Sequence, residues 1–316
     1  MKNIVRILAC ALGIATALPA AAALKEIFSL GGGAFAQDHI YRVDLSTSTV
    51  TDLGSSGIGF PTNLAMAPDR TLYYMNPFEA HSLYKATLNG TNTALVGAPT
   101  LVAALPTVGF GIIDGMTVGP DGNLYMTGYG KNEIYRYDPV ANVFTVAVVL
   151  TGGGAGGGEF RSDLAFDPIT GNLVGLGVEP GSTDRTLFEI PALTVLTGTS
   201  NPYTWSYYGG ALGAWSTKKL DVGTELGGNP DGLAFDPTNG DLYMSGDGTG
   251  IYIYDRTTAL RGALIADTGD GNLNGLGFDL AFQTRDAPIG VPSPGTLWLL
   301  LVGLGAMAMR QRAIRR

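Results

Sequence analysis

The stretch DGLAFDPTNGDLYMSG, residues 231–246, places one apolar run before Asp-Pro and Asn-Gly and a second apolar run after them. Pro237 restricts φ and Gly240 tolerates positive φ, so the residues between the two runs favour a tight turn. Short apolar runs on both sides of such a turn are typical of a β-hairpin. We therefore expect paired strands at 233–235 and 242–245.

The same pattern recurs along the chain, most closely as SDLAFDPITGNLVGLG at residues 162–177. The first large apolar residues of its five copies are Leu64, Met116, Leu164, Leu233 and Leu276. Successive copies are 52, 48, 69 and 43 residues apart. A period of about 40 to 50 residues with several strands in each unit is typical of β-propeller blades. The first strand of each hairpin would be the inner strand of a blade.

A third strand is expected in each unit, because apolar and polar residues alternate there. These segments are IYRVD at 40–44, LYKAT at 83–87, IYRYD at 134–138, LFEIP at 187–191 and IYIYD at 251–255.

The region that contains the repeats, residues 24–285, is called the body below. The strands of one blade are divided between its two ends. The copy at Leu276 has no strands after it, whereas EIFSLGG at 26–32 and IYRVD at 40–44 have no inner strand before them. The ends are therefore expected to complete one blade, which closes the ring and leaves no exposed edge. The predicted fold of residues 24–285 is all-β, a β-propeller of about five blades. Six blades are the alternative, since the 69-residue interval leaves room for another.

The hairpins resemble those of NHL-type and gluconolactonase-like propellers, whose inner strand and following turn read much like GLAFDPTNGDLYMS. The resemblance covers most of the body and implies that ligands bind at the mouth of the central channel. Gluconolactonase-like enzymes hold a metal ion in this channel with Glu, Asp and Asn side chains. Polar residues at the start of the inner strands are expected to ring the mouth, namely Asn63, Asp114, Asp163, Asp231 and Asn274.

These five residues have two interpretations. Their oxygen atoms could hold a cation such as calcium, or they could bond to nearby backbone and stabilise the turns that lead into each strand. No glutamate lies at these positions, which disfavours a gluconolactonase-like activity. The segment DGNLNG at 270–275 matches the first half of a calcium loop, but Ala281 stands where the closing acidic residue is needed. We expect no cofactor, with calcium as the open alternative.

Aromatic residues gather within the 69-residue interval. Trp205 and Trp215 lie there with several tyrosines, and both indoles could stack against sugar rings. The spacing of Tyr203, Trp205 and Tyr207 also fits one buried face of a strand, because every second residue of a strand points the same way. Sugar binding and burial both remain open for this stretch.

Motifs for catalysis are scarce. The chain has neither a G-x-S-x-G nor an H-E-x-x-H motif, and its histidines are His39 and His81. We therefore expect a non-enzymatic binding or scaffold protein. A metal-dependent, lactonase-like hydrolase that acts in the channel is the alternative.

The N-terminus has the three regions of a secretory signal peptide. Lys2 and Arg6 precede an apolar core, and Ala20–Ala23 supplies small residues for cleavage, so residues 1–23 are expected to be removed. The single cysteine, Cys10, lies within this segment. The exported body would therefore contain no disulfide and depend on packing for its stability.

The C-terminal stretch VPSPGTLWLLLVGLGAMAMRQRAIRR, residues 291–316, resembles the PEP-CTERM sorting tail of Gram-negative bacteria. The resemblance implies recognition and processing by an exosortase, although Ser293 stands where such tails usually have Glu. The matching features are a Val-Pro-x-Pro signature and a basic cluster after an apolar helix, carried by Val291, Pro292, Pro294, Arg310 and Arg312.

Residues 296–316 are expected to form a transmembrane helix and a basic tail, after a linker at 286–295. The segment Thr296–Met309 is uncharged, and the 19 residues from Val291 to Met309 match a hydrocarbon core of about 30 Å at 1.5 Å per residue. The arginines that follow would stay on the cytoplasmic side of the inner membrane. An anchor that is never processed is the alternative.

The body is strongly acidic. All 27 acidic residues but only 13 of the 19 basic ones lie between residues 24 and 290. Such a surface repels phosphate backbones, so a nucleic-acid partner is not expected. The expected protein is exported, held at first in the inner membrane and then placed at the cell surface or in the extracellular matrix. Exopolysaccharide or envelope proteins are its expected partners there.

Overall fold

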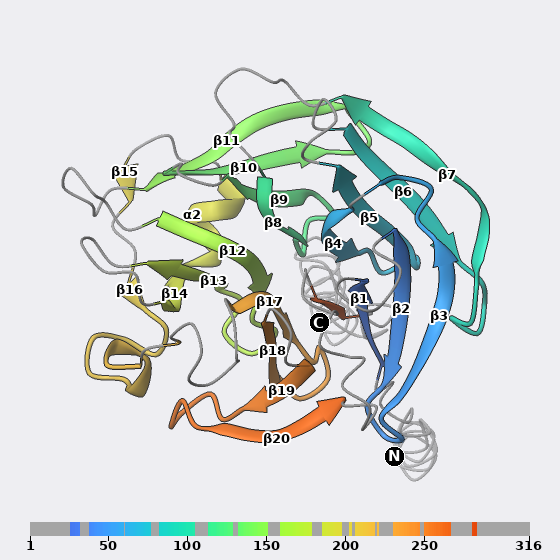
Figure 1. The fold of residues 1–316 in the computed structure, drawn as a ribbon. Coiled ribbons are helices and arrows are strands. Elements are labelled where there is room, and N and C mark those ends of the chain that lie inside the picture. Colours follow the sequence, from blue (N-terminus) through green and yellow to red (C-terminus); the bar gives the residue numbers. More distant parts are fainter. Residues whose placement is uncertain are drawn as a thin grey trace, which may run out of the picture.

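The computed structural model shows five sheets arranged as blades around a centre (Figure 1). The residues that the structure describes are 26–31, 38–59, 61–76, 82–104, 113–128, 132–150, 159–178, 185–197, 202–203, 206–218, 220, 230–246, 250–266 and 280–282.

From the inside outward, blade 1 contains β21 (Leu280–Phe282), β1 (Glu26–Leu30), β2 (His39–Asp44) and β3 (Thr49–Ser55). Blade 2 contains β4 (Thr62–Met66), β5 (Thr71–Asn76), β6 (Ser82–Leu88) and β7 (Leu95–Ala104). Blade 3 contains β8 (Ile113–Val118), β9 (Leu124–Gly128), β10 (Glu133–Asp138) and β11 (Val143–Leu150). Blade 4 contains β12 (Glu159–Phe166), β13 (Leu173–Val178), β14 (Arg185–Ile190) and β16 (Ser206–Tyr207). Blade 5 contains β17 (Pro230–Phe235), β18 (Leu242–Gly246), β19 (Gly250–Tyr254) and β20 (Arg261–Ala266).

Blade 1 is built from both ends of the body, as the sequence predicted. Strand β21 pairs antiparallel with β1, with Ile27 opposite Phe282 and Ser29 opposite Leu280. Strand β1 in turn pairs with β2. The last inner strand and the first two N-terminal strands therefore form one sheet, which closes the ring.

Each blade also has a fourth, outer strand, which the sequence analysis did not predict. In β7 the ten residues LVGAPTLVAA include Gly97 and Pro99, and all of them are exposed or half-buried. An outer strand is covered on one side only, so its apolar positions are fewer than those of the inner strands. Its alternation is correspondingly weak, and the segment does not stand out in the sequence.

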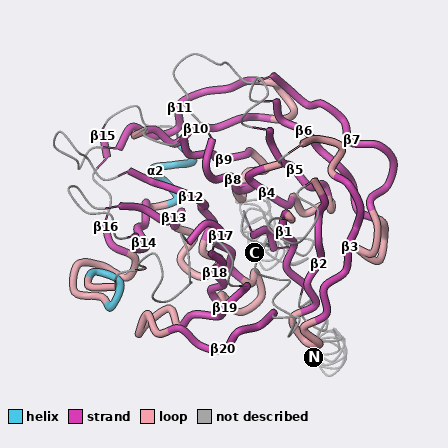
Figure 2. The backbone as a smooth tube through the Cα atoms, in the orientation of Figure 1, coloured by secondary structure: helices cyan, strands magenta, loops and turns pink. Residues whose placement is uncertain are grey.

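The 69-residue interval does not contain a sixth blade; the described residues form five sheets. After β14 the chain forms a short helix, α2 (Ala192–Thr197), and then β15 (Pro202–Tyr203), which pairs parallel with β11 of blade 3. Strand β16 completes blade 4, and a loop with the 3-10 helix η1 (Ala214–Ser216) follows. Figure 2 shows both helical segments on the side of the ring where blade 4 lies.

The core lies between blades rather than inside them. The buried apolar side chains of the described residues form five clusters, each drawn from two adjacent blades, so that every blade shares a cluster with both neighbours. Phe28 of blade 1, for example, packs with Leu64 and Tyr74 of blade 2, and none of the three is exposed. No blade can bury both of its faces alone, which is why the same sequence pattern must recur.

The final Asp of the third strands shapes the turn that follows. Asp138 accepts hydrogen bonds from the N–H groups of Val140 and Ala141 at 2.8 and 2.9 Å. Asp44 and Asp255 make the same kind of contact at the equivalent places in blades 1 and 5. The hydrogen bonds from these backbone N–H groups lower the pKa values of Asp138 and Asp255 below the ordinary value of an Asp side chain. The Asp of IYRVD, IYRYD and IYIYD is thus a turn residue.

The predicted signal peptide at 1–23, the linker at 286–295 and the membrane segment at 296–316 lie outside the described residues. Within the part of the chain that the structure describes, no helix combines the length and apolarity needed to cross a membrane.

Candidate functional site

The inner strands form the wall of the ring around its centre. Each of β4, β8, β12, β17 and β21 contacts the inner strands of both neighbouring blades, in that order around the ring. The residues predicted to line the channel mouth belong to these strands or to the segments that lead into them.

In four blades the pairing between the inner strand and the second strand shifts at a predicted mouth residue. The irregularities lie between Thr62 and Leu64, Ile113 and Gly115, Phe160 and Leu164, and Pro230 and Gly232. A β-bulge leaves its extra residue out of the ladder and re-aims its side chain. The residues inside these shifts include Asn63, Asp114, Asp163 and Asp231.

Asn63 uses its position to join blade 2 to blade 3. Its φ is +59°, a left-handed conformation that Asn tolerates better than most residues, and its side chain is 1% exposed. The Nδ2 atom donates a hydrogen bond of 2.7 Å to the carbonyl of Ile113 in β8. The side chain therefore satisfies a backbone group of the next blade.

Asp163 joins blade 4 to blade 5 in the same direction around the ring. Its carboxylate is fully buried. Oδ1 accepts the N–H of Leu164 at 2.8 Å, and Oδ2 accepts the N–H of Leu233 in β17 at 2.9 Å. The bond at Oδ1 stays within β12, and the bond at Oδ2 links the inner strands of blades 4 and 5.

The remaining predicted mouth residues are placed only in part. Asp114 and Asp231 occupy the bulge positions of β8 and β17, and Asn274 lies outside the described residues, as does the segment at 270–275. Across the described ranges, no group of three or more His, Cys, Asp or Glu side chains could hold a metal ion. For Asn63 and Asp163 the structure supports the backbone-bonding interpretation, with partners that belong largely to the next blade.

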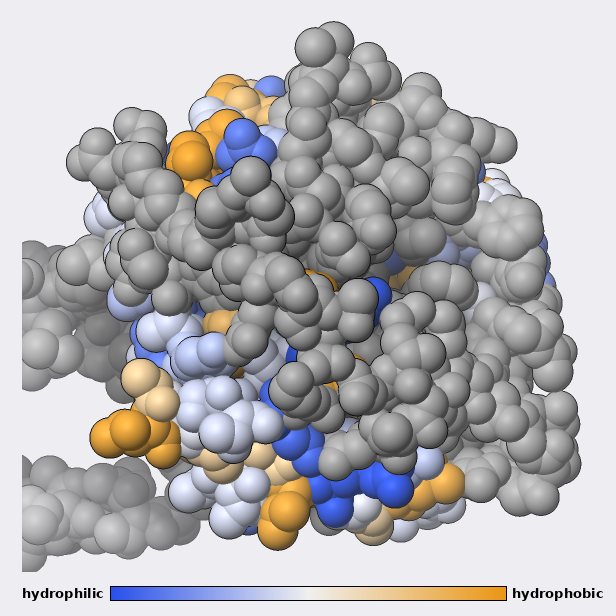
Figure 3. Space-filling view, turned by 60° about the vertical axis from the view of Figure 1, so that its left-hand side comes forward, coloured by the Kyte–Doolittle hydropathy of each residue, from blue (hydrophilic) through white to orange (hydrophobic). Residues whose placement is uncertain are grey.

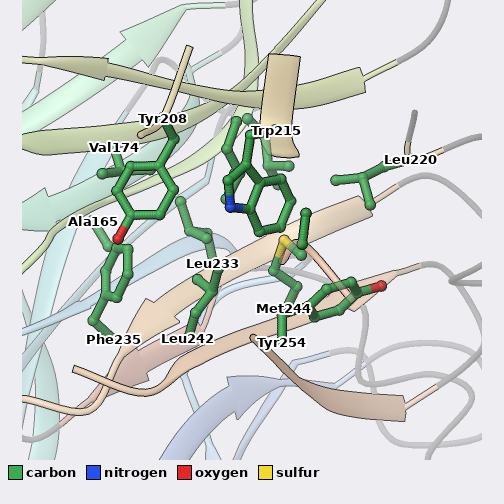
Figure 4. Close-up of a cluster of buried hydrophobic side chains, with 13 residues drawn as sticks. Ala165, Val174, Tyr208, Trp215, Leu220, Leu233, Phe235, Leu242, Met244 and Tyr254 are labelled. Carbon is green, nitrogen blue, oxygen red and sulfur yellow. The ribbon is translucent and has the colours of Figure 1, made fainter. Parts of the chain in front are cut away.

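The structure places Trp215 in the core between blades 4 and 5 (Figure 4). The indole is 1% exposed, and its Nε1 donates a 2.8 Å hydrogen bond to the carbonyl of Arg256. A ring with so little exposed surface offers no face to a sugar, so we assign Trp215 to packing. Trp205 lies outside the described residues.

A polar network beside Trp215 was not found from the sequence. Asp167, which is fully buried, accepts hydrogen bonds from the Tyr208 hydroxyl at 3.0 Å and from Nη2 of Arg256 at 2.5 Å. Nε of Arg256 donates to the Tyr208 oxygen at 2.8 Å. Burial and the Asp167 charge raise the pKa of Tyr208. The sequence marks Asp167 only as a turn residue, because its partner lies 89 residues away.

A cavity of about 620 Å³ opens next to this network, between blades 4 and 5. Its lining combines apolar, aromatic, amide, hydroxyl and charged side chains from the turns after β12, β17 and β19, from the end of β14 and from the loop after β16. The principal side chains are Ile169, Thr170, Asn172, Glu189, Tyr208, Trp215, Asn239, Arg256 and Thr257.

Comparison with known proteins agrees with this fold. Residues 28–149, which run from blade 1 to blade 3 and make up less than half of the chain, match the family model described as the SMP-30/gluconolactonase/LRE-like region. No curated protein matches the chain in sequence.

Solved structures are also similar, and two of them serve as examples. One is a chain in the crystal structure of a nidogen/laminin complex, with 14% identity over 81% of this chain and 97% of that one and a TM-score of 0.49. The other is a protein of unknown function from Bacteroides thetaiotaomicron, with 14% identity over 81% of this chain and 64% of that one and a TM-score of 0.48. The body is a five-bladed β-propeller that resembles gluconolactonase-like proteins over its first three blades.

Replacing Asp163 tests its role as a link between blades. Asp163→Ala leaves two buried N–H groups without their acceptor, and each such group costs about 1–3 kcal/mol. We expect the free energy of unfolding of the full-length chain, measured in guanidinium chloride, to fall by about 3 kcal/mol.

Two variants serve as controls for this measurement. Asp163→Asn keeps an acceptor oxygen and should lose less stability than Asp163→Ala. Asp69→Ala removes a turn carboxylate that accepts a single hydrogen bond, from the N–H of Thr71, and should lose about 1 kcal/mol or less. Equal stability of Asp163→Ala and the wild-type chain would contradict a structural role for the carboxylate.

Proposed function

We propose that this chain is an exported propeller of the cell envelope or extracellular matrix that works by binding, as a scaffold or as a receptor for exopolysaccharide or envelope proteins. The observation that carries the non-enzymatic part is the bonding of Asp163. Both of its oxygens accept backbone N–H groups, one of them from the next blade. A cation at this place would have to share oxygens that already accept the N–H groups of Leu164 and Leu233, in a side chain that is fully buried.

The bonding of Asn63 supports the same conclusion. In gluconolactonase-like enzymes the channel side chains hold a metal ion. Nδ2 of Asn63 donates to the carbonyl of Ile113 in the adjacent blade, and the side chain is only 1% exposed, so it offers little surface to a ligand in the channel. Two of the residues that the sequence offers as ligands are therefore already engaged in structural contacts.

The export part of the proposal rests on the two ends of the sequence. Residues 1–23 have the pattern of a signal peptide, and the tail at 291–316 resembles a sorting signal that an exosortase would recognise. The body between them contains no cysteine and is acidic, which suits a soluble domain outside the inner membrane. In this proposal the C-terminal helix anchors the protein before processing.

A lactonase-like hydrolase is the second candidate. The observation that favours it is the family match over residues 28–149, since that family's description includes gluconolactonase. Its metal site would require the oxygens of Asp114 and Asp231, which occupy bulge positions equivalent to that of Asn63.

Metal analysis separates the two candidates. We expect the full-length chain to hold no divalent cation after dialysis and to keep the same Tm when a chelator is added, because a cation has no part in the blade-to-blade contacts. One equivalent of tightly bound cation that is lost in Asp114→Asn or Asp231→Asn would favour the hydrolase instead.

The intact mass of protein recovered from the producing cells tests export and sorting. We expect the mature protein to lack residues 1–23 and the terminal basic cluster that contains Arg310 and Arg312. A mass that retains the whole C-terminus would show an unprocessed anchor, and one that retains residues 1–23 would contradict the predicted cleavage.

Retention on a column of the producing strain's exopolysaccharide tests the binding role. We expect the full-length chain to be retarded on this column and to pass freely through a column of the uncoated support. Free passage through both columns would contradict a glycan-binding role.

A further inference from the structure

The cavity between blades 4 and 5 lies away from the predicted channel mouth. Its walls come from the turn after β12, from the end of β14, from the loop after β16 and from the turns after β17 and β19. The turns after β12 and β17 follow the inner strands, whereas Asp163 and Asp231 lie within those strands, before the turns. The cavity therefore belongs to a different part of the ring from the sites considered so far.

Its volume and its opening suit a small ligand. About 620 Å³ lies within the range of roughly 300–1,000 Å³ that small-molecule pockets cover. Thr170, Asn239 and Thr257 are exposed at its rim, so the space is open to solvent. Tyr208 and Trp215, which are 4% and 1% exposed, form part of the packed wall beneath.

Two turns of neighbouring blades approach each other closely beside the cavity. Gly240 is buried, has a φ of +75° and lies in the turn of blade 5 that faces Ile169 of blade 4. A Cβ atom at Gly240 would come within 2.6 Å of Cδ1 of Ile169 and would also collide with Nη1 of Arg256. The turn of blade 5 and Ile169 of blade 4 are therefore in contact at this edge of the cavity.

The lining is chemically mixed. Ile169 is 65% exposed and offers an apolar surface, while Asn172, Glu189 and Asn239 supply planar groups that donate and accept hydrogen bonds. Figure 3 brings this side of the molecule forward, and its described surface shows small hydrophobic groups among hydrophilic residues. A ligand that combines C–H faces with hydroxyl groups matches such a lining better than a purely apolar one does.

The charges of the site disfavour an anion. Arg256 is already paired with the buried carboxylate of Asp167, and Glu189 adds a negative charge that no guanidinium or ammonium group in the lining balances. The oxygens of Glu189 accept hydrogen bonds from Nδ2 of Asn172 at 2.9 Å and from the N–H of Gly209 at 3.2 Å. These neutral donors leave Glu189 less suited to a cation, so an uncharged ligand is favoured.

We propose that this cavity binds one or two units of a neutral saccharide. Ile169 packs against the C–H face of a sugar ring, and Asn172, Glu189 and Asn239 bond to its hydroxyl groups. The inference rests on the proposed function, since it names the site through which the propeller would contact exopolysaccharide. It differs from the sequence-based expectation, because it uses neither the channel mouth nor the exposed face of an indole.

Saturation-transfer NMR on the full-length chain, kept in a detergent without sugar groups, tests the site. The probes are the methyl glycosides of glucose, galactose and mannose, with glucuronate as the anionic comparison. We expect saturation transfer to at least one neutral glycoside and a weaker signal for glucuronate. Glu189→Gln, which removes the negative charge, should raise the glucuronate signal relative to the neutral one.

Ile169→Ser removes the apolar contact at an exposed position, and Val140→Ser makes the same kind of change at a turn residue that is 96% exposed and outside the cavity. We expect Ile169→Ser to weaken binding of the neutral glycoside roughly tenfold, equivalent to about 1.4 kcal/mol, and Val140→Ser to leave it unchanged. Thr257→Phe, which narrows the cavity from its opposite rim, should abolish binding.

The outcomes distinguish this site from the proposed function as a whole. Absence of transfer to all three neutral glycosides, or an equal effect of Ile169→Ser and Val140→Ser, overturns the cavity site. If the wild-type chain and Ile169→Ser are equally retained on exopolysaccharide, the protein binds glycan elsewhere and only the cavity inference fails. If the glycosides bind in the cavity but the polysaccharide column does not retain the chain, the cavity inference stands and the proposed partner is wrong.

Discussion

The inner strands must pair within their own blade and also contact the inner strands of the neighbouring blades. The rest of the ring depends on how they do both. Each pairs along one edge with the second strand of its own blade and also lies against the inner strands of two other blades. Backbone groups that face a neighbouring blade have no ladder partner, yet they are buried and must be satisfied. The bulges meet this need, because Asn63 and Asp163 leave the ladder and bond to Ile113 and Leu233 of the next blade.

Closure of the ring through blade 1 also depends on contacts between neighbouring blades. The apolar clusters that blade 1 shares with blades 2 and 5 draw on side chains of β1 and β2, so they depend on the sheet to which these strands belong. That blade requires β1 and β21, which come from opposite ends of the body. Pairing between segments so distant in the sequence is opposed by loop-closure entropy, so it becomes favourable only with the packing of the blades on either side.

The features that the sequence revealed are those set by local chemistry or by repetition. The Asp-Pro and Asn-Gly turns identified the hairpins, and the missing strands at the two ends identified the shared blade, as the pairing of Ser29 with Leu280 confirms. The outer strands were missed because half-exposed strands carry little apolar alternation. The bonds among Asp167, Tyr208 and Arg256 were missed because they join residues 41 to 89 positions apart, which no local pattern records.

The proposed saccharide cavity arises where the repeat is least regular. In blade 4 the outer strand is reduced to the two residues Ser206 and Tyr207, and the chain that follows folds over the junction with blade 5. Trp215 and Tyr208 from this loop complete the apolar cluster between the two blades, while neighbouring loop residues line the cavity. In a regular blade the residues after the third strand form the outer strand, which pairs along the third strand. They are therefore not available to line a cavity. The insertion therefore adds a binding surface without disturbing the inner strands, in keeping with repeat folds whose insertions lie on one face.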